Sequence, residues 1–149
     1  PMGITLAKET IFQSFISDSP KKTFWHGHSF TANPLGCAAA NASLDLLEKD
    51  PIKYLSFEEK HLSHLKKIKK LPFVKNIRVT GTIAAFDIEI GKNKGYLNNI
   101  GKRIKALSIK KGLFIRPLGN VIYLLPPLCI TDNQLEKSYR IIFEILSDL

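Results

Sequence analysis

The stretch KNIRVTGTIAAFDIEI, residues 75–90, decides the fold of this chain, because it contains two alternating patterns joined by a turn. Apolar and polar residues alternate on both sides of Gly81-Thr82, as they do in half-buried strands. A glycine at the first central position suits a type II′ turn, which connects antiparallel strands. The sequence therefore predicts a β-hairpin, with Asp87 and Glu89 on its solvated face.

Helical patterns flank this hairpin. One helix is predicted over residues 57–70 and another over residues 95–111. The second ends at Gly112, a residue that readily adopts the left-handed conformation beyond a helix end. Two short strands, Leu113–Arg116 and Val121–Leu125, are predicted next, around a Pro-Leu-Gly-Asn turn.

The last helix has the strongest local signals. Thr131 and Gln134 have the spacing of a capping box, and Ile130 and Leu135 have that of a hydrophobic staple. An apolar stripe follows at helical spacing, formed by Leu135, Tyr139, Ile142, Leu146 and Leu149. The mixture of helices and short strands over residues 51–149 predicts a small α+β domain.

A separate helix is predicted over residues 33–50. Asn33 can cap its first amides, Pro34 suits its first turn, and Asp50-Pro51 ends it. Its interior is rich in small residues, which permit other backbones to approach it from more than one side. This pattern suits a helix that bridges two domains.

The composition is that of a globular protein. The chain has 149 residues, of which 44% are hydrophobic and 23% charged, and these values argue against disorder. No apolar run approaches the ~20 residues that span a bilayer, and PMGITLAKETIF lacks the layout of a signal peptide. We therefore expect a cytoplasmic protein without a membrane partner, in which Cys37 and Cys129 are buried and reduced.

The net charge of +9 comes mostly from lysines in two stretches. Clustered cations bind nucleic-acid phosphates, but no aromatic residues interleave with them as a stacking platform requires. The pattern favours the solvated faces of two helices, and no nucleic-acid partner is expected. The residues are Lys66, Lys67, Lys69 and Lys70, and then Lys102, Arg103, Lys105, Lys110 and Lys111.

The stretch WHGHSFTAN, residues 25–33, places polar groups between aromatic residues just before a helix. Gly27 permits close approach of a ligand to the backbone, and the Ser29 hydroxyl with neighbouring amides can hold a phosphate. The alternative is a simple turn in which Ser29 makes a local hydrogen bond. Composition alone favours the turn.

Arg116 lies among apolar residues, in the predicted strand that begins at Leu113. A guanidinium in such surroundings is costly unless an anion pairs with it. The anion is either the carboxylate of a substrate, held by two parallel hydrogen bonds, or an acidic residue of the same domain. The residues alone leave both interpretations open.

Other chemistries find no support. His26 with His28, and His61 with His64, are pairs that zinc sites use, but no cysteine or carboxylate stands near them at ligand spacing. No metal site is therefore predicted. The chain has no Gly-x-Ser-x-Gly elbow, Walker loop or dinucleotide motif, and no complete set of catalytic residues.

Two longer runs resemble a known family. FWHGHSFTANPLGCAAANASLDLLE, residues 24–48, resembles class III pyridoxal-phosphate aminotransferases in the segment that follows their cofactor-binding lysine. GLFIRPLGNVIYLLPPLCIT, residues 112–131, resembles the members that act in biotin biosynthesis. The resemblance covers nearly the whole chain and implies the type I fold of pyridoxal-phosphate enzymes. It implies that residues 1–32 are a remnant of the large domain, residues 33–50 the interdomain helix and residues 51–149 the small C-terminal domain.

The resemblance also implies an activity and a site. These enzymes transfer an amino group from S-adenosylmethionine to 8-amino-7-oxononanoate, giving 7,8-diaminononanoate, and both subunits of a homodimer contribute to each site. By resemblance, Gly27 lies against the substrate, His28 and Ser29 reach the cofactor phosphate, and Arg116 binds the substrate carboxylate. Some members have Pro where this chain has His28.

In the family, the lysine that forms the Schiff base should stand before the position of Pro1, and Lys8, Lys21 and Lys22 do not match it. That amine is needed for imine exchange and for proton transfer. The resemblance therefore implies a C-terminal fragment that is inactive alone. The alternatives are another class III aminotransferase, with a different amino donor or acceptor, and a non-catalytic module derived from one.

Overall fold

A computed structural model describes most of the chain and divides it into two compact units. The described residues are 2–51, 56–90, 95 and 97–149. The units are residues 1–50 and residues 51–149, and are called unit 1 and unit 2 below. The assignment of the predicted segments to a large domain, an interdomain helix and a small domain stays a prediction.

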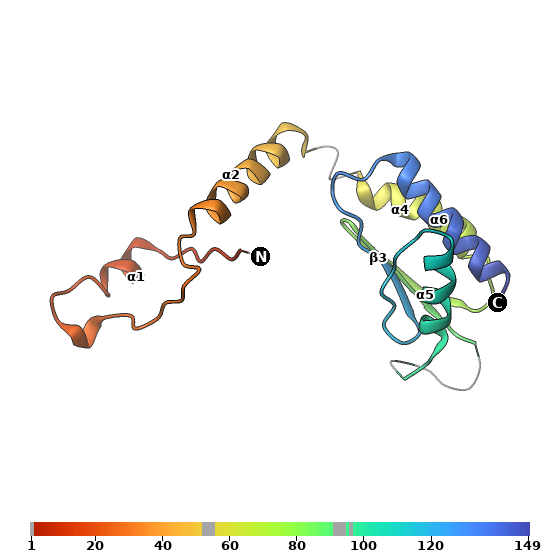
Figure 1. The fold of residues 1–149 in the computed structure, drawn as a ribbon, viewed down its shortest axis with the longest axis horizontal. Helices are drawn as coiled ribbons and strands as arrows, with labels where there is room; N and C mark the ends of the chain where they lie inside the picture. Colours follow the sequence, from red (N-terminus) through yellow and green to blue (C-terminus); the bar gives the residue numbers. More distant parts are fainter. Residues whose placement is uncertain (1, 52–55, 91–94, 96) are drawn as a thin grey trace. The chain divides into compact units, whose positions relative to one another are not determined.

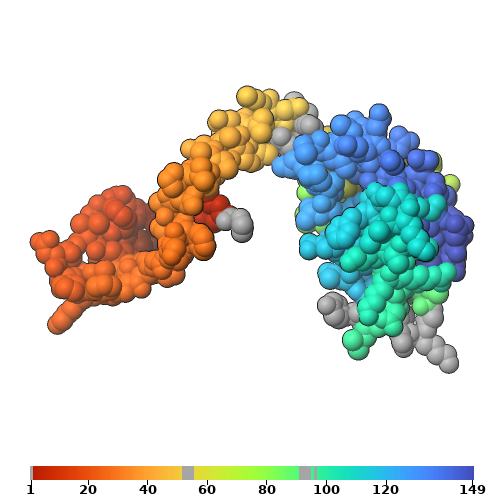
Figure 2. Space-filling model, in the orientation of Figure 1, coloured from red at the N-terminus to blue at the C-terminus, as the bar shows by residue number. Residues whose placement is uncertain are grey.

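Unit 1 contains the short helix α1 (Glu9–Gln13), the 3₁₀ turn η1 (Pro20–Lys22) and the long helix α2 (Pro34–Lys49). The predicted start of α2 is confirmed, because the Asn33 side chain accepts a hydrogen bond from the amide of Gly36 at 3.0 Å. No described residue of this unit is buried, and Figure 2 shows its side chains largely uncovered along the red and orange segment.

Unit 2 is a two-layer α+β structure, as predicted. Its described elements are α4 (Phe57–Ile68), β1 (Val74–Thr80), β2 (Ile83–Ile88), α5 (Ile100–Lys110), β3 (Val121–Leu124) and α6 (Asp132–Ser147). The strands form an antiparallel sheet in the order β1-β2-β3. Helix α6 contacts both α4 and α5, and α4 also contacts the hairpin (Figure 1).

The core lies between the helices and one face of this sheet. Alternate residues of β2 and β3 are buried against helical residues, because successive side chains of a strand point to opposite faces. Each large apolar side chain buried in this way stabilises the fold by roughly 1.5–3 kcal/mol. The sheet contributes Ala84, Phe86, Ile88, Ile122 and Leu124, and the helices contribute Leu65, Ile68, Ile104, Leu135, Ile142, Ile145 and Leu146.

The hairpin confirms the predicted turn but corrects one face. Gly81 has a φ of +54°, the sign that a type II′ turn requires of its first central residue. The register between β1 and β2 shifts between Lys75 and Arg78. The prediction that Asp87 is solvated was wrong, because its side chain is only 19% exposed and pairs with Arg78 at 2.9 Å. A β-bulge is not visible in an alternating pattern, and this one displaces the pairing opposite Asp87.

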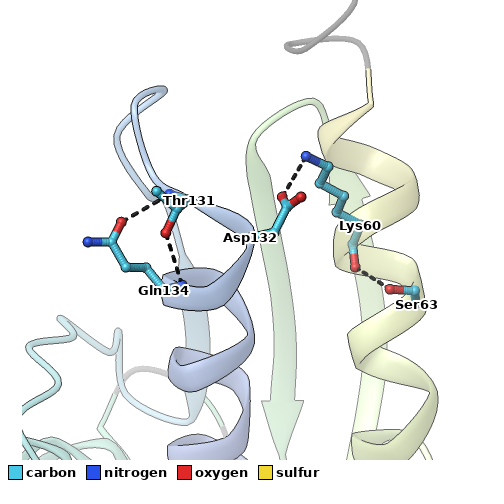
Figure 3. A network of polar contacts seen from close by, with 5 residues as sticks. All are labelled: Lys60, Ser63, Thr131, Asp132 and Gln134. Atoms are coloured by element: carbon cyan, nitrogen blue, oxygen red, sulfur yellow. Dashed lines mark hydrogen bonds and ion pairs between the residues drawn. The ribbon is translucent and has the colours of Figure 1, made fainter.

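The start of α6 is held as predicted. The amide of Gln134 donates to the Thr131 hydroxyl at 3.3 Å, and the amide of Thr131 donates to the Gln134 side chain at 3.0 Å (Figure 3). In the same figure, the Lys60 ammonium lies 2.7 Å from the Asp132 carboxylate. The ion pair joins α4 to the first turn of α6.

One predicted strand, the start of one predicted helix and the predicted burial of both cysteines were wrong. Leu113–Arg116 is not a strand, because the sheet ends at β3 and no described strand pairs with this segment. The helix predicted from residue 95 begins at Ile100, and Leu97 is 86% exposed; residue 96 lies outside the described residues. Both cysteines are free, but neither is buried. Cys37 is only half-buried in unit 1, and Cys129 is exposed, since it follows β3 in a segment with little cover.

Candidate functional site

The predicted site residues fall into two groups. Gly27, His28 and Ser29 belong to one loop of unit 1, and Arg116 belongs to unit 2. Each group is therefore defined by contacts within its own unit.

The loop before α2 is shaped by the neighbours of Ser29. The amide of Phe30 donates to His28 Nδ1 at 3.3 Å, and the amide of His28 donates to the Thr31 hydroxyl at 3.4 Å. Ala32 has a φ of +52°. The loop is therefore a turn, but its side-chain hydrogen bonds come from His28 and Thr31, and Thr31 was not singled out from the sequence.

Ser29 makes no hydrogen bond to any residue that the structure describes. The local bond that the turn interpretation assigned to it is absent from this part of the chain, and its exposed hydroxyl is open to a ligand. His28 has one nitrogen engaged, since Nδ1 accepts from Phe30. In a neutral ring the proton then lies on Nε2, which can donate to a phosphate.

Gly27 is not required by the packing of unit 1. A Cβ atom placed on it meets no heavy atom within 4 Å, and its φ is not among the positive values of the described residues. A glycine here leaves open space beside His28 and Ser29. This open space is compatible with the predicted role of Gly27, which is to let a substrate approach the backbone closely.

Arg116 lies at an open pocket of about 290 Å³ in unit 2. Of the described residues that line the pocket, Arg116 alone carries a charge; Tyr123 and Ser138 add hydroxyl groups. The rest of the lining is apolar: Leu113, Phe114, Ile115, Leu124, Leu125, Pro126, Pro127, Ile130 and Leu135. The pocket therefore presents one cation to a mainly apolar cavity.

One of the two interpretations of Arg116, the internal salt bridge, finds no support among the described residues. Its guanidinium is exposed and makes no ion pair with any acid of the described residues. The internal salt bridge is thus not formed within this part of the chain. The expectation of a buried strand position was also wrong, because none of the described strands pairs with Leu113–Arg116 and Arg116 is exposed. An unpaired guanidinium beside apolar walls can bind a carboxylate that ends an aliphatic chain.

A buried polar group lies elsewhere in unit 2, at His61, which the sequence analysis considered only as half of a zinc pair. His61 Nδ1 is 2.6 Å from the Tyr139 hydroxyl, and His61 Nε2 is 3.0 Å from the Thr82 carbonyl oxygen. His64 stacks on Tyr139 at 4.9 Å. Burial lowers the pKa of His61 and raises that of Tyr139.

Both nitrogens of His61 are occupied, so it is not available as a metal ligand. No three His, Cys, Asp or Glu side chains gather as a metal site in the described ranges. Within those ranges, no helix has the length and apolar character needed to cross a bilayer.

The sequence of the chain matches one family over almost all of its length. The profile of "Aminotransferase class-III" matches residues 1–146. The chain is 46% identical over its whole length to adenosylmethionine-8-amino-7-oxononanoate aminotransferase of Synechococcus elongatus, and covers 35% of that protein. It is 35% identical, over 94% of its length, to a mitochondrial bifunctional dethiobiotin synthetase/7,8-diamino-pelargonic acid aminotransferase of Oryza sativa, and covers 19% of it.

The fold is also similar to solved structures. The crystal structure of adenosylmethionine-8-amino-7-oxononanoate aminotransferase from Methanocaldococcus jannaschii matches with a TM-score of 0.80 and 29% identity. The match covers 93% of this chain and 33% of that one. The chain thus spans about a third of the length of the Synechococcus and Methanocaldococcus proteins.

Proposed function

Because this chain belongs to the class III aminotransferases, we propose that it acts as the C-terminal part of an enzyme of biotin biosynthesis. The reaction transfers an amino group from S-adenosylmethionine to 8-amino-7-oxononanoate and gives 7,8-diaminononanoate. The proposal is supported by the name of the Synechococcus relative, which is similar over all 149 residues. Since the chain spans 35% of that relative, the activity is proposed for a longer protein.

The observation that carries the proposal is the pocket at Arg116. The acceptor 8-amino-7-oxononanoate has a carboxylate at one end of an aliphatic chain and its ketone and amine at the other. A cation can pair with the carboxylate, and apolar walls can contact the aliphatic chain beside it. The pocket provides both the cation and the walls. Arg116 would fix the acceptor by its unreactive end, and the Tyr123 and Ser138 hydroxyls are further polar groups within the same lining.

The loop of unit 1 is proposed to serve the cofactor. When bound, pyridoxal 5′-phosphate supplies the electron sink for exchange of the amino group. The Ser29 hydroxyl and the His28 Nε2 are proposed to hold its phosphate, which the open hydroxyl and the hydrogen bond at Nδ1 both favour. Gly27 would leave room for the substrate. A homodimer in which both subunits contribute to each site, and a cytoplasmic location, belong to the same proposal.

The chain's own lysines near this loop are not proposed to react. If the 149-residue chain is mixed with pyridoxal phosphate and reduced with borohydride, we expect no stoichiometric adduct on Lys8, Lys21 or Lys22. Peptide mass spectrometry provides the measurement. A full adduct on one of these residues would show that the chain contains the Schiff-base lysine.

Substitution of Arg116 tests the function directly. In the full-length protein that contains this chain, Arg116→Ala should raise the KM for 8-amino-7-oxononanoate roughly 10- to 100-fold, the size of a lost hydrogen bond to a charged group. Arg116→Lys should raise the KM by an intermediate factor. Lysine keeps the positive charge but cannot form the two parallel hydrogen bonds that a guanidinium makes to a carboxylate. Arg103→Ala removes an exposed arginine of α5 and should leave the KM unchanged.

Two results would contradict the proposal. An unchanged KM in Arg116→Ala would remove the carboxylate role from this residue. Efficient transfer to a different keto acid, with none to 8-amino-7-oxononanoate, would assign the chain to another member of the family.

A further inference from the structure

We propose that Gly101 is a positioning residue for substrate binding, and that it acts by holding the turn that follows Arg116. The inference rests on the proposed role of Arg116 in binding a carboxylate. Gly101 was not singled out by the sequence, whereas the turn lies within residues 112–131, the run that resembles the family. The start of α5 contacts the turn formed by residues 117–120.

The first turn of α5 is joined to this turn by a backbone hydrogen bond. Gly101 is the second residue of the helix and is buried. Its amide donates to the carbonyl oxygen of Gly119 at 3.1 Å. The first amides of a helix have no partner inside it, and the Asn98 side chain accepts the preceding one, from Ile100, at 2.8 Å. The turn therefore completes the N-terminus of α5.

Only a glycine permits this contact. A Cβ atom at position 101 would lie 2.8 Å from the Cβ of Pro117 and would overlap the carbonyl oxygen of Gly119. The second of these atoms is backbone, so it cannot move aside as the end of a long side chain can. Any larger residue at position 101 must push the turn away from α5.

The opposite side of the turn is anchored in the sheet. Asn120 is 6% exposed, and its side-chain amide donates to the carbonyl of Ile88 at 3.2 Å. The amide of Ile88 donates back to the Asn120 carbonyl at 2.9 Å. Leu118 and Val121 also exchange two backbone hydrogen bonds, each of 2.9 Å. The turn is held between α5 and β2, and it cannot yield on one side without breaking contacts on the other.

Arg116 depends on this anchoring because it directly precedes Pro117 and has no strand partner. Its guanidinium makes no ion pair with a described residue that would hold it independently. Its backbone is set by the buried Ile115 before it and by the turn after it, so a displacement of the turn shifts the side chain. A displacement of about 1 Å in a group that positions a substrate is enough to reduce its effect strongly.

The test is the substitution Gly101→Ala in the full-length protein with pyridoxal phosphate bound. The KM for 8-amino-7-oxononanoate should rise about tenfold, whereas kcat should change by less than about threefold, because the misplaced group binds the unreactive end of the substrate. Lys102→Ala, at the exposed next position of α5, should leave both constants unchanged. Alanine is the better helix former, so a loss of binding cannot be attributed to weaker helix propensity.

A double-mutant cycle decides whether Gly101 acts through Arg116. In an Arg116→Ala background, Gly101→Ala should add no further increase in KM, since the group that it displaces is already gone. A full additional tenfold increase would overturn the inference. So would an unchanged KM in Gly101→Ala while Arg116→Ala raises it, a result that leaves the proposed function intact. An unchanged KM in Arg116→Ala would overturn both.

Asn120→Ala provides a second route if Gly101→Ala does not yield folded protein. It removes the side-chain hydrogen bond to the Ile88 carbonyl and so loosens the turn on the side of β2 without adding atoms, while the backbone hydrogen bond from the Ile88 amide remains. It should raise the KM in the same way and should also be non-additive with Arg116→Ala. An unchanged KM in a folded Asn120→Ala protein would contradict positioning by the turn.

Discussion

The two units have equally clear helix signals but very different packing. Helix α2 begins at the cap Asn33, and helix α6 begins at the capping box of Thr131. No described residue of unit 1 is buried, whereas α6 buries six side chains. Phe30 in unit 1 is 78% exposed, and Phe86 in unit 2 is 0% exposed. Local signals thus set where a helix starts, but burial depends on a partner from elsewhere in the chain.

Among residues 2–50, which the structure describes, no segment buries the side chains of helix α2. Leu35 is 83% exposed and Leu44 is 50% exposed, although both belong to an apolar, small-residue helix. We predict that other parts of a longer protein cover these residues, in agreement with the interdomain position that the resemblance implies. Four experiments test this difference between the units.

The largest difference is expected for a matched pair of phenylalanines. Phe86→Ala should destabilise unit 2 by about 3–5 kcal/mol, because it removes a buried ring and leaves a cavity. Phe30→Ala should change the same free energy of unfolding by less than about 0.5 kcal/mol, as exposed substitutions usually do. Urea unfolding provides the measurement. Equal effects of the two substitutions would show that unit 1 has a core of its own.

The second effect concerns the buried polar group of unit 2. Tyr139→Phe removes the hydroxyl that lies 2.6 Å from His61 Nδ1. A buried nitrogen without a partner costs about 1–3 kcal/mol, and the free energy of unfolding should fall by that amount. Tyr123→Phe, at the partly exposed pocket, is the control and should be nearly neutral. If Tyr139→Phe left the free energy of unfolding unchanged, a water molecule would have to supply the hydrogen bond that His61 Nδ1 loses.

The third effect compares the two helix caps. Thr131→Ala should lower the stability of unit 2 by about 1 kcal/mol, since the amide of Gln134 loses its acceptor. Asn33→Ala removes the corresponding acceptor for Gly36. It should reduce the helical circular dichroism signal without moving the unfolding midpoint of unit 2. If Asn33→Ala also lowered the unfolding midpoint of unit 2, the two units would unfold together.

The smallest expected effect is a gradual change in the stability of unit 2 with pH. The pKa of His61 is lowered from its ordinary value of 6.5, chiefly by burial, and that of His64 is lowered for the same main reason. The unfolded chain therefore binds more protons than the folded one as the pH falls through 6.5. Unit 2 should be most stable above about pH 7.5 and should lose stability between pH 7.5 and 6.0.

Unfolding midpoints at constant ionic strength will show this dependence. His64→Ala should remove part of it and leave the part due to His61. Stability that stays flat over this range, or rises as the pH falls, would contradict the prediction.

The features of the fold that depend on local signals could be predicted from the sequence alone. The cap at Asn33, the glycine turn at Gly81 and the capping box at Thr131 were all read correctly. Each depends on hydrogen bonds or dihedral angles within a few residues, so each is recorded in the order of the amino acids. The two runs that resemble class III aminotransferases were also recognisable from the sequence, and they named Gly27, His28, Ser29 and Arg116 as site residues, roles that stay predictions.

The features that depend on partners far along the chain could not be predicted from the sequence and became visible only in the folded structure. The segment Leu113–Arg116 has strand-like residues, but no described strand pairs with it. Asp87 is mostly covered and pairs with Arg78, beside the register shift in β1. The contact of Gly101 with Gly119, and of His61 with Tyr139, join residues far apart in sequence. Such contacts form only when the core brings the elements together, because the free energy of burial is a property of the packed structure and not of any single segment.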